Sequence, residues 1–266
     1  MAQKLWHHRG QMSEAFRTVM FLSASGGLQD AYTYIGRGKV FANAQTGNIV
    51  LLSANLMDGN WERALHYLVP LCAFALGVLT AEKMRERFRD LQRLHWRQLV
   101  VLGEVVLLFL VGFLPPAQNL LANAIVSFAC AMQVQAFRKV DGYAFASTMC
   151  IGDLRSGMEA LCIWRKTHEP KARDRMLRYF GIILLFAIGA GLGSKSSAGI
   201  GGRAIWISCG LLLVSFALMF IREDLEENPV IEKDLAEIRQ ETKEIDHALK
   251  QELQEEHREL KESAKK

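Results

Sequence analysis

Six long apolar stretches constrain this sequence more than any other feature. They cover about residues 17–35, 66–83, 98–114, 118–137, 177–194 and 203–221. A helix needs about 20 apolar residues to cross a bilayer, and about 17 suffice at the short end of the range. The sequence therefore predicts an all-α, polytopic helical membrane protein in contact with the lipid bilayer, and it argues against a soluble enzyme with a single core.

The charged residues lie mainly in short linkers and in a C-terminal tail, which the mean hydropathy of +0.09 conceals. From Arg222 to Lys266, 24 of 45 residues are charged and the net charge is −6, whereas residues 1–221 carry +10. We therefore divide the chain into a cytoplasmic N-terminus (1–16), a transmembrane domain (17–221) and a charged helical tail (222–266).

Two basic linkers predict the orientation. Segments 83–97 and 165–178 each carry six Lys or Arg residues, and basic linkers stay on the cytoplasmic side. The two linkers lie on the same side of the membrane only if the partly polar segment 144–163 enters and leaves from the cytoplasmic side. If segment 41–57 likewise enters and leaves from the outside, both termini lie in the cytoplasm. We expect about six crossings and two broken or re-entrant segments; seven or eight crossings are the alternative.

The two halves of the transmembrane domain resemble each other. A shift of 105 residues aligns Leu28–Tyr32 with Gln133–Phe137, and Gly47-Asn48 with Gly152-Asp153. The halves, about 17–114 and 118–221, then share the order helix, polar broken segment, helix, helix. Three crossings in each half predict a 3+3 inverted repeat, an arrangement typical of transporters and channels, unless the similarity arises by chance.

Two carboxylic acids fall inside predicted spans. An ionisable side chain there costs about 2.5–3.5 kcal/mol, so a partner or an aqueous cavity is expected. Asp30 is either a protonatable or cation-binding group in a transport pathway or an acid that hydrogen-bonds the broken segment. Glu104 is either a relay carboxylate or the partner of Arg97 or of a neighbouring helix.

The broken segments supply the other candidate residues. Polar side chains beside Gly47 either face a solute or cap the helix expected near Ile49. Asp153 either joins them or pairs with Arg155, and Gln135 either lines the pathway or joins two helices. The predicted solute- or ion-pathway residues are Asp30, Asn43, Gln45, Thr46, Gly47, Asn48, Glu104, Gln135 and Asp153.

No motif for catalysis occurs in the sequence. It contains no nucleophile elbow, zinc-protease helix or phosphate loop, and the five cysteines lie in or beside apolar segments without the spacing of metal ligands. We therefore expect neither enzyme activity, nor a cofactor, nor a bound metal, nor a nucleic-acid partner.

Several ordered elements resemble a known family. The elements are Gly26-Gly27-Leu28-Gln29-Asp30-Ala31, Phe41, Gln45-Thr46-Gly47-Asn48, Phe74-x-x-Gly77 and Met132-Gln133-x-Gln135. Together they resemble the bacterial YoaK family of uncharacterised multi-spanning membrane proteins, over roughly residues 20–221. The resemblance implies an integral membrane location but neither a substrate nor catalytic residues.

Two function classes are therefore expected. The first is a transporter or channel for a small solute or ion. The second is a membrane scaffold or sensor that recruits a partner through its tail. Apolar residues three and four apart within 229–251 predict a helix there that either pairs as a short coiled coil, with a second copy or another protein, or stays solvated.

Overall fold

The computed structural model describes residues 16–88, 96–140, 143–144 and 150–219. Residues 223–266 form a unit separate from residues 1–222. The predicted tail helix, with its partner segment 229–251, lies outside the described residues, as does the predicted N-terminal segment 1–16 except for Phe16. The described residues therefore belong almost entirely to the predicted transmembrane domain.

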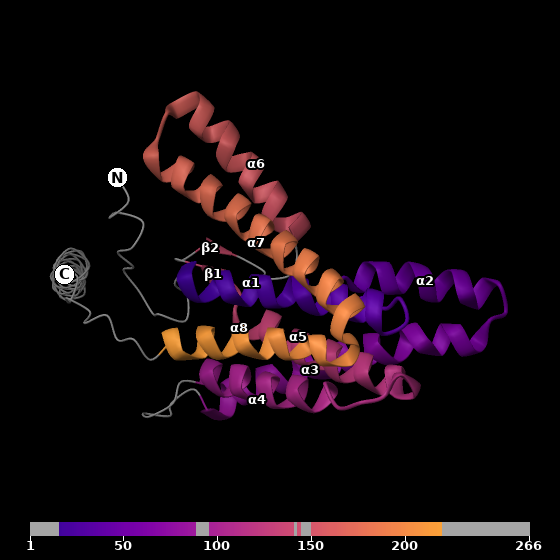
Figure 1. Cartoon of the computed structure of the whole chain (residues 1–266). Helices are drawn as coiled ribbons and strands as arrows, with labels where there is room; N and C mark the ends of the chain where they lie inside the picture. Colours follow the sequence, from indigo (N-terminus) through magenta and orange to yellow (C-terminus); the bar gives the residue numbers. More distant parts are fainter. Residues whose placement is uncertain (1–15, 89–95, 141–142, 145–149, 220–266) are drawn as a thin grey trace, which may run out of the picture. The chain divides into compact units, whose positions relative to one another are not determined.

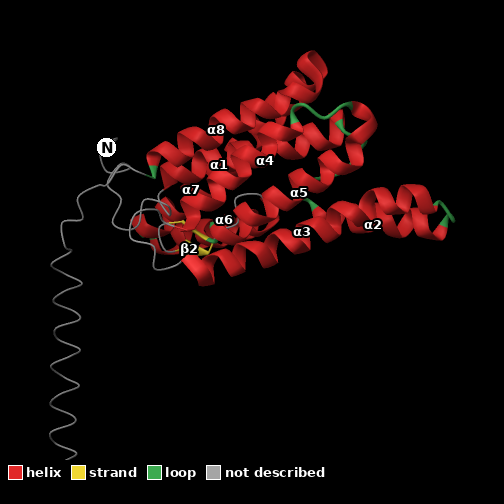
Figure 2. Ribbon diagram, turned by 90° about the horizontal axis from the view of Figure 1, so that it is seen from below, coloured by secondary structure: helices red, strands yellow, loops and turns green. Residues whose placement is uncertain are grey.

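Helices make up nearly all of the described chain (Figures 1 and 2). In this part the α-helices are α1 (Phe16–Ala31), α2 (Gln45–Met57), α3 (Trp61–Phe88), α4 (Trp96–Val111), α5 (Asn119–Ala136), α6 (Cys150–Thr167), α7 (Pro170–Ile200) and α8 (Ile205–Leu218). The short turns η3 (Tyr32–Gly36), η4 (Pro116–Gln118) and η5 (Gly201–Ala204) extend or join them, and strands β1 (Lys139–Val140) and β2 (Tyr143–Ala144) pair antiparallel. The all-α prediction is confirmed apart from this two-stranded hairpin.

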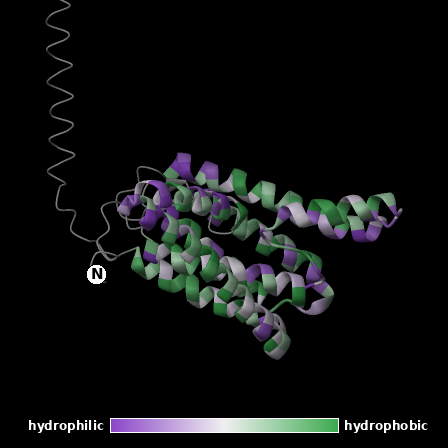
Figure 3. Ribbon diagram, turned by 90° about the horizontal axis from the view of Figure 1, so that it is seen from above, coloured by the Kyte–Doolittle hydropathy of each residue, from purple (hydrophilic) through white to green (hydrophobic). Residues whose placement is uncertain are grey.

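Three helical stretches within the described ranges are long and apolar enough to cross a membrane. They are Trp61–Phe88, Pro116–Ala136 and Pro170–Leu218. The third contains both α7 and α8, which are separated where Gly201 adopts a φ of 58°. Figure 3 shows hydrophobic residues along the lengths of the helices and a dense group of hydrophilic residues at one end. The helix lengths and this distribution fit a bundle that lies in a membrane.

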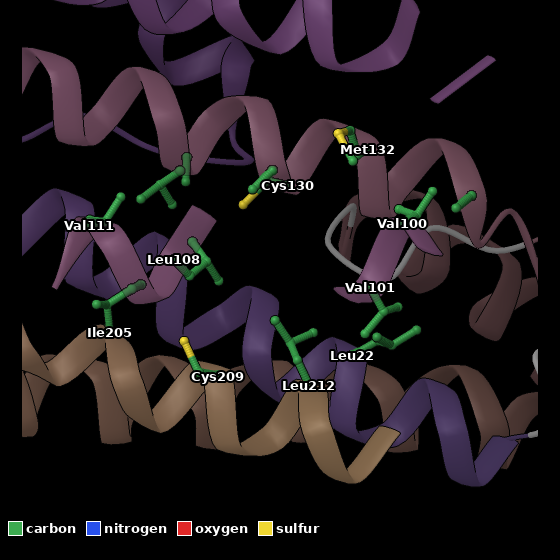
Figure 4. Packing of buried hydrophobic residues seen from close by; sticks show 14 of the residues in the cluster. Leu22, Val100, Val101, Leu108, Val111, Cys130, Met132, Ile205, Cys209 and Leu212 are labelled. Atoms are coloured by element: carbon green, nitrogen blue, oxygen red, sulfur yellow. The ribbon is translucent and has the colours of Figure 1, made fainter. Parts of the chain in front are cut away.

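Four helix pairs make the most extensive contacts in the described part of the chain. The most extensive contacts join α1 to α7 and α3 to α5, and the next join α6 to α7 and α1 to α8. Helix α2 packs on α3, and α4 packs on α5 and α8. Between α1, α4, α5 and α8 lies an apolar core that includes Leu22, Val101, Leu108, Cys130 and Leu212 (Figure 4).

Hydrogen bonds define the two ends of the bundle. At one end, the Arg37 guanidinium contacts the α4–α5 turn at Leu114, and the Tyr32 hydroxyl donates to the carbonyl of Gly202 in η5. At the other end, the Gln98 amide donates to the carbonyl of Met219, just after α8. The turns after α1, α4 and α7 therefore share one end, and the start of α4 and the end of α8 share the other.

The two polar segments that the sequence marks as broken are the short helices α2 and α6. Each is buried near its start and otherwise mostly exposed: Asn48 is the buried residue of α2, and Asp153 is buried in the first turn of α6. The α2–α3 hairpin extends past the neighbouring helices in both views (Figures 1 and 2). Helix α2 packs along α3 and helix α6 packs along α7, and the buried polar side chain of each lies in or near its first turn.

Candidate functional site

A polar cluster lies in the centre of the apolar core, built around Gln29 of α1. Its side-chain nitrogen Nε2 lies 3.0 Å from each of three oxygens, namely Ser25 Oγ, Glu104 Oε1 and Ser208 Oγ. Ser25 Oγ and Ser208 Oγ also share a hydrogen bond, and the Cys130 thiol contacts Gln29 Oε1. We call these five residues the Gln29 cluster; they come from α1, α4, α5 and α8.

The helix period explains how this cluster forms. Ser25 and Gln29 are four residues apart, so they lie on the same face of α1. Glu104 stands between Val101 and Leu108 on the buried face of α4, and all three are fully buried. Figure 4 shows that the side chains of Cys130 and Cys209 point into the same interior as Leu108. Apolar neighbours therefore exclude water from the five polar side chains.

Glu104 forms no ion pair with any of the described residues. Its Oε1 accepts a hydrogen bond from Gln29, whereas its buried Oε2 has no hydrogen-bond partner among the described residues. No ion pair between Glu104 and Arg97 is present among the described residues, and Arg97 Nε donates to the carbonyl of Ala136. Pairing with a neighbouring helix is confirmed. A buried carboxyl group left half-satisfied is costly, and in membrane domains such residues mark ion pathways and proton relays.

Asp30 holds the loop between η3 and α2. Its Oδ1 accepts a hydrogen bond of 2.7 Å from the backbone nitrogen of Asn43, and the Asn43 amide donates to the carbonyl of Gly26. The expected hydrogen bond between this acid and the broken segment is confirmed. Asp30 is buried and belongs to none of the ion pairs formed by the described residues. It follows Gln29 in the chain, so the loop and the Gln29 cluster are adjacent.

The polar residues at the start of α2 bond mainly to their own loop. Asn48 accepts a hydrogen bond from the nitrogen of Phe41 and donates to its carbonyl oxygen, and it also contacts Gln45 Oε1. Gln45 donates to the carbonyl of Ala42, Gly47 lies against the Phe41 ring, and Thr46 is exposed.

The capping alternative for these residues is wrong in its details. Helix α2 begins at Gln45 rather than near Ile49, and its N-cap Ala44 makes no side-chain cap bond. The side chains of Asn48 and Gln45 instead fix the course of the loop that precedes the helix.

The start of α6 approaches Asp30. Cys150 interacts electrostatically with both Asp153 and Asp30, and Asp153 lies in the first turn of α6, where a negative charge is favourable. Asp153 is buried whereas Arg155 is exposed. The structure therefore brings Asp30, Asn43, Asp153 and, through Gln29, Glu104 into one region.

Gln135 lies apart from this region. Its amide donates to Glu82 Oε2 of α3 at 2.8 Å, and Glu82 in turn pairs with Arg85. The alternative that Gln135 joins two helices is confirmed.

Arg37 is a buried residue that the sequence does not single out. Its guanidinium donates to the Tyr32 hydroxyl, to the carbonyl oxygens of Val111 and Leu114, and to Asn119. The carbonyls at the C-terminal end of α4 are left without intrahelical partners, and a cation is favourable there. Arg37 therefore joins three turns at one end of the bundle. Its position between Gly36 and Gly38, in a non-helical loop, is the signal that could have marked it.

The Gln29 cluster also contains residues that the sequence analysis did not propose. Ser25, Gln29, Cys130 and Ser208 were not expected to form a site. Two polar residues four apart within an apolar helix are a usable signal for α1, but nothing local to α8 pairs Ser208 with them. Among the described residues, no three His, Cys, Asp or Glu side chains form a group that could hold a metal ion.

Comparison with known proteins establishes the family. The family model described as "Protein of unknown function (DUF1275)" matches residues 18–218. The chain belongs to this family. It is 27% identical over 190 residues to the UPF0700 transmembrane protein YoaK of Bacillus subtilis (strain 168), an alignment that covers 66% of this chain and 82% of that relative. No solved structure matches the chain. The predicted membership of the YoaK family is confirmed, and with it a membrane location in contact with lipid.

Proposed function

We propose that this membrane protein is a transporter or channel for a small solute or ion. The observation that carries the proposal is the Gln29 cluster, in which a fully buried acid, Glu104, lies among side chains from α1, α4, α5 and α8 and forms no ion pair with any described residue. A half-satisfied polar cluster of this kind costs stability. Ionisable residues that are kept inside a membrane at such a cost usually belong to a solute or ion pathway.

The similarity between the two halves of the chain supports the proposal. Gly77 of α3, in the first half, lies against the backbone of Phe128 in α5 of the second half, and Gly189 of α7, in the second half, lies against the backbone of Ala24 in α1 of the first. The two glycines are 112 positions apart and their partners 104 apart, close to the 105-residue shift found in the sequence. Corresponding helices of the halves 17–114 and 118–221 thus meet through corresponding residues.

Six crossings make the two halves inverted. The helix pairs α1 with α7 and α5 with α3 correspond, and Asn48 and Asp153 occupy matching places at the starts of α2 and α6. In this layout α2 enters from outside and α6 from the cytoplasm, so that the broken segments meet the bundle from opposite faces. Transporters with inverted repeats place their binding sites at such segments.

The basic linkers support the orientation. The positive-inside rule places 83–97 and 165–178 in the cytoplasm, with both termini on the same side. The bundle end that holds the turns after α1, α4 and α7 then faces outward. We assign the protein to the inner membrane of a bacterium on this basis and on its similarity to the Bacillus relative.

Transport can be tested with purified full-length protein in liposomes. We expect flux for at least one probe in a panel of glycerol, urea, Na⁺, K⁺ and Cl⁻, followed by light scattering or by a potential-sensitive dye. Asp30→Asn and Asn48→Ala should abolish that flux while the variants elute and melt as folded protein. Glu82→Gln is the matched control, because Glu82 is a partly exposed acid of α3 outside the cluster.

The scaffold or sensor alternative has a separate outcome. Its partner segment, 229–251, lies outside the described residues. If a cellular phenotype of the gene depends on residues 229–266 but survives Asp30→Asn and Asn48→Ala, the transport proposal fails.

A further inference from the structure

The hydrogen bonds around Gln29 cannot all form in one state of the cluster. A glutamine side-chain nitrogen carries two hydrogens, yet three oxygens lie 3.0 Å from Gln29 Nε2. At the other end of the amide, Oε1 accepts from the Cys130 thiol and has no second donor among the described residues. The donor end of Gln29 is therefore crowded with acceptors, and Glu104 Oε2 remains unused beside it.

Every partner of Gln29 can reverse its role. A serine hydroxyl and a thiol each donate or accept, and a carboxyl group accepts when ionised and donates when protonated. The two ends of a glutamine amide are nearly equal in size, so a half-turn of the amide exchanges donor and acceptor within the same space. After that half-turn, Oε1 faces Glu104, Ser25 and Ser208, and Nε2 faces the Cys130 sulfur.

The cluster therefore has two hydrogen-bond arrangements that differ by one proton. In the first, the Glu104 carboxylate accepts from Gln29 Nε2, as the structure records. In the second, a proton on Glu104 is donated to Gln29 Oε1 after the amide has turned. The proton comes from water and returns to water, and no other bond is made or broken.

We propose that Glu104 binds and releases a proton during transport, and that the Gln29 amide turns over with each change. This inference rests on the proposed transport function and names the proton as a substrate or coupling ion. The titratable groups that interact electrostatically with Glu104 are the Cys130 thiol of α5 and the Cys209 thiol of α8. Asp30 of α1 also interacts electrostatically with the Cys130 thiol. Among the described residues no Lys, Arg or His forms an ion pair with Glu104, so a proton is the positive charge that can neutralise it.

Infrared difference spectroscopy of the full-length protein in liposomes tests the site without any solute. As the pH is lowered across the range in which the protein stays folded, we expect the carbonyl band of a protonated, buried carboxyl group to appear. Glu104→Gln should remove this band and Glu82→Gln should leave it. Gln29→Leu should keep the band but move its frequency and its titration midpoint, because the amide partner is lost.

Three results would overturn the proposal. The first is a wild-type protein with no such band, and the second is a band that persists unchanged in Glu104→Gln. The third is a band that Asp30→Asn removes and Glu104→Gln does not, because the titrating group would then be Asp30. If Glu104→Gln does not fold, Glu104→Asp serves instead: it keeps a carboxyl group in a changed position, so the band should shift rather than stay.

Proton movement separates this inference from the general transport proposal. Liposomes containing a trapped pH-sensitive dye, with a potassium diffusion potential set by valinomycin, report proton flux directly. Wild-type flux that is lost in Glu104→Gln and kept in Glu82→Gln supports the proton site. Solute flux that continues in Glu104→Gln with an unchanged pH dependence sinks the proton site but leaves transport standing. A titrating Glu104 band without flux of any probe supports the site and contradicts transport.

Discussion

At the scale of single residues, Arg37 is the cation on which one end of the bundle depends. Its guanidinium is 2% exposed and donates to carbonyl groups of the α4–α5 turn and to a tyrosine hydroxyl. The planar fork of arginine reaches several acceptors at once, which a lysine ammonium on a single stem cannot do. The charge therefore matters less than the number and direction of the donors.

We predict that Arg37→Lys lowers thermal stability although it keeps the charge. The carbonyl oxygen of Leu114 would lose a donor and that of Val111 would keep only the backbone nitrogen of Leu114, and a buried group left unsatisfied costs about 1–3 kcal/mol. Melting of the detergent-solubilised protein checks this. Arg63→Lys is the control, because Arg63 is exposed on α3. Equal melting temperatures for the two variants would show that the Arg37 hydrogen bonds contribute little.

Single residues also show what the sequence could not predict. Asp30 and Glu104 stand out because each is an acid within an apolar run, and both proved to be buried and hydrogen-bonded. Ser25 and Ser208 are unremarkable in the sequence, since small hydroxyl residues are common in membrane helices. The two serines are 183 positions apart in the chain, and they meet only because α1 packs against α8. No local pattern encodes that distance.

At the scale of elements, close contacts between backbones set the positions of α1 and α3. Gly27, Gly189 and Gly193 line the contact of α1 with α7, and Gly77 lies in the contact of α3 with α5. A Cβ atom at Gly193 would lie 2.6 Å from the carbonyl oxygen of Leu28. Small residues at such crossings let helices approach closely in a membrane, where packing replaces the hydrophobic effect as the driving force.

We predict that Gly189→Ala and Gly77→Ala destabilise the protein to similar extents. In each case the added methyl group overlaps a backbone carbonyl of the facing helix, and overpacking typically costs about 1–3 kcal/mol. Gly191→Ala is the matched control on α7, because no atom lies within 4 Å of its added Cβ. Thermal melting should leave that control unchanged or raise it, since alanine favours helix. Similar melting temperatures for Gly189→Ala and Gly191→Ala would contradict the close contact.

The elements themselves were largely predictable. The expected spans 66–83 and 177–194 correspond to α3 and α7, which run on to Phe88 at one end and from Pro170 at the other. Basic residues end the apolar stretch that a hydropathy analysis detects, but they do not end the helix, because lysine and arginine are good helix formers. Hydropathy thus located the apolar centres of these helices and missed their charged extensions.

At the scale of the whole molecule, the number of crossings decides whether the halves are inverted. The side of the membrane on which three exposed turn positions lie gives the number of crossings. These positions are Asn60 between α2 and α3, Gln118 before α5, and Glu169 between α6 and α7. With the N-terminus inside, six crossings place residues 60 and 118 outside and 169 inside. If α2 and α6 both cross, all three lie inside. If only α2 crosses, 169 alone lies outside, and if only α6 crosses, all three lie outside.

Each layout therefore gives its own labelling pattern, and we predict the pattern of six crossings. The five native cysteines are first replaced, because Cys72 and Cys162 are exposed and would react. Single cysteines at 60, 118 and 169 are then treated with a membrane-impermeant maleimide in intact cells and again after permeabilisation. Asn60→Cys and Gln118→Cys should react in intact cells, and Glu169→Cys only after permeabilisation. Protection of position 60 in intact cells would make α2 a crossing helix, and the two halves would then no longer be related as three inverted crossings each.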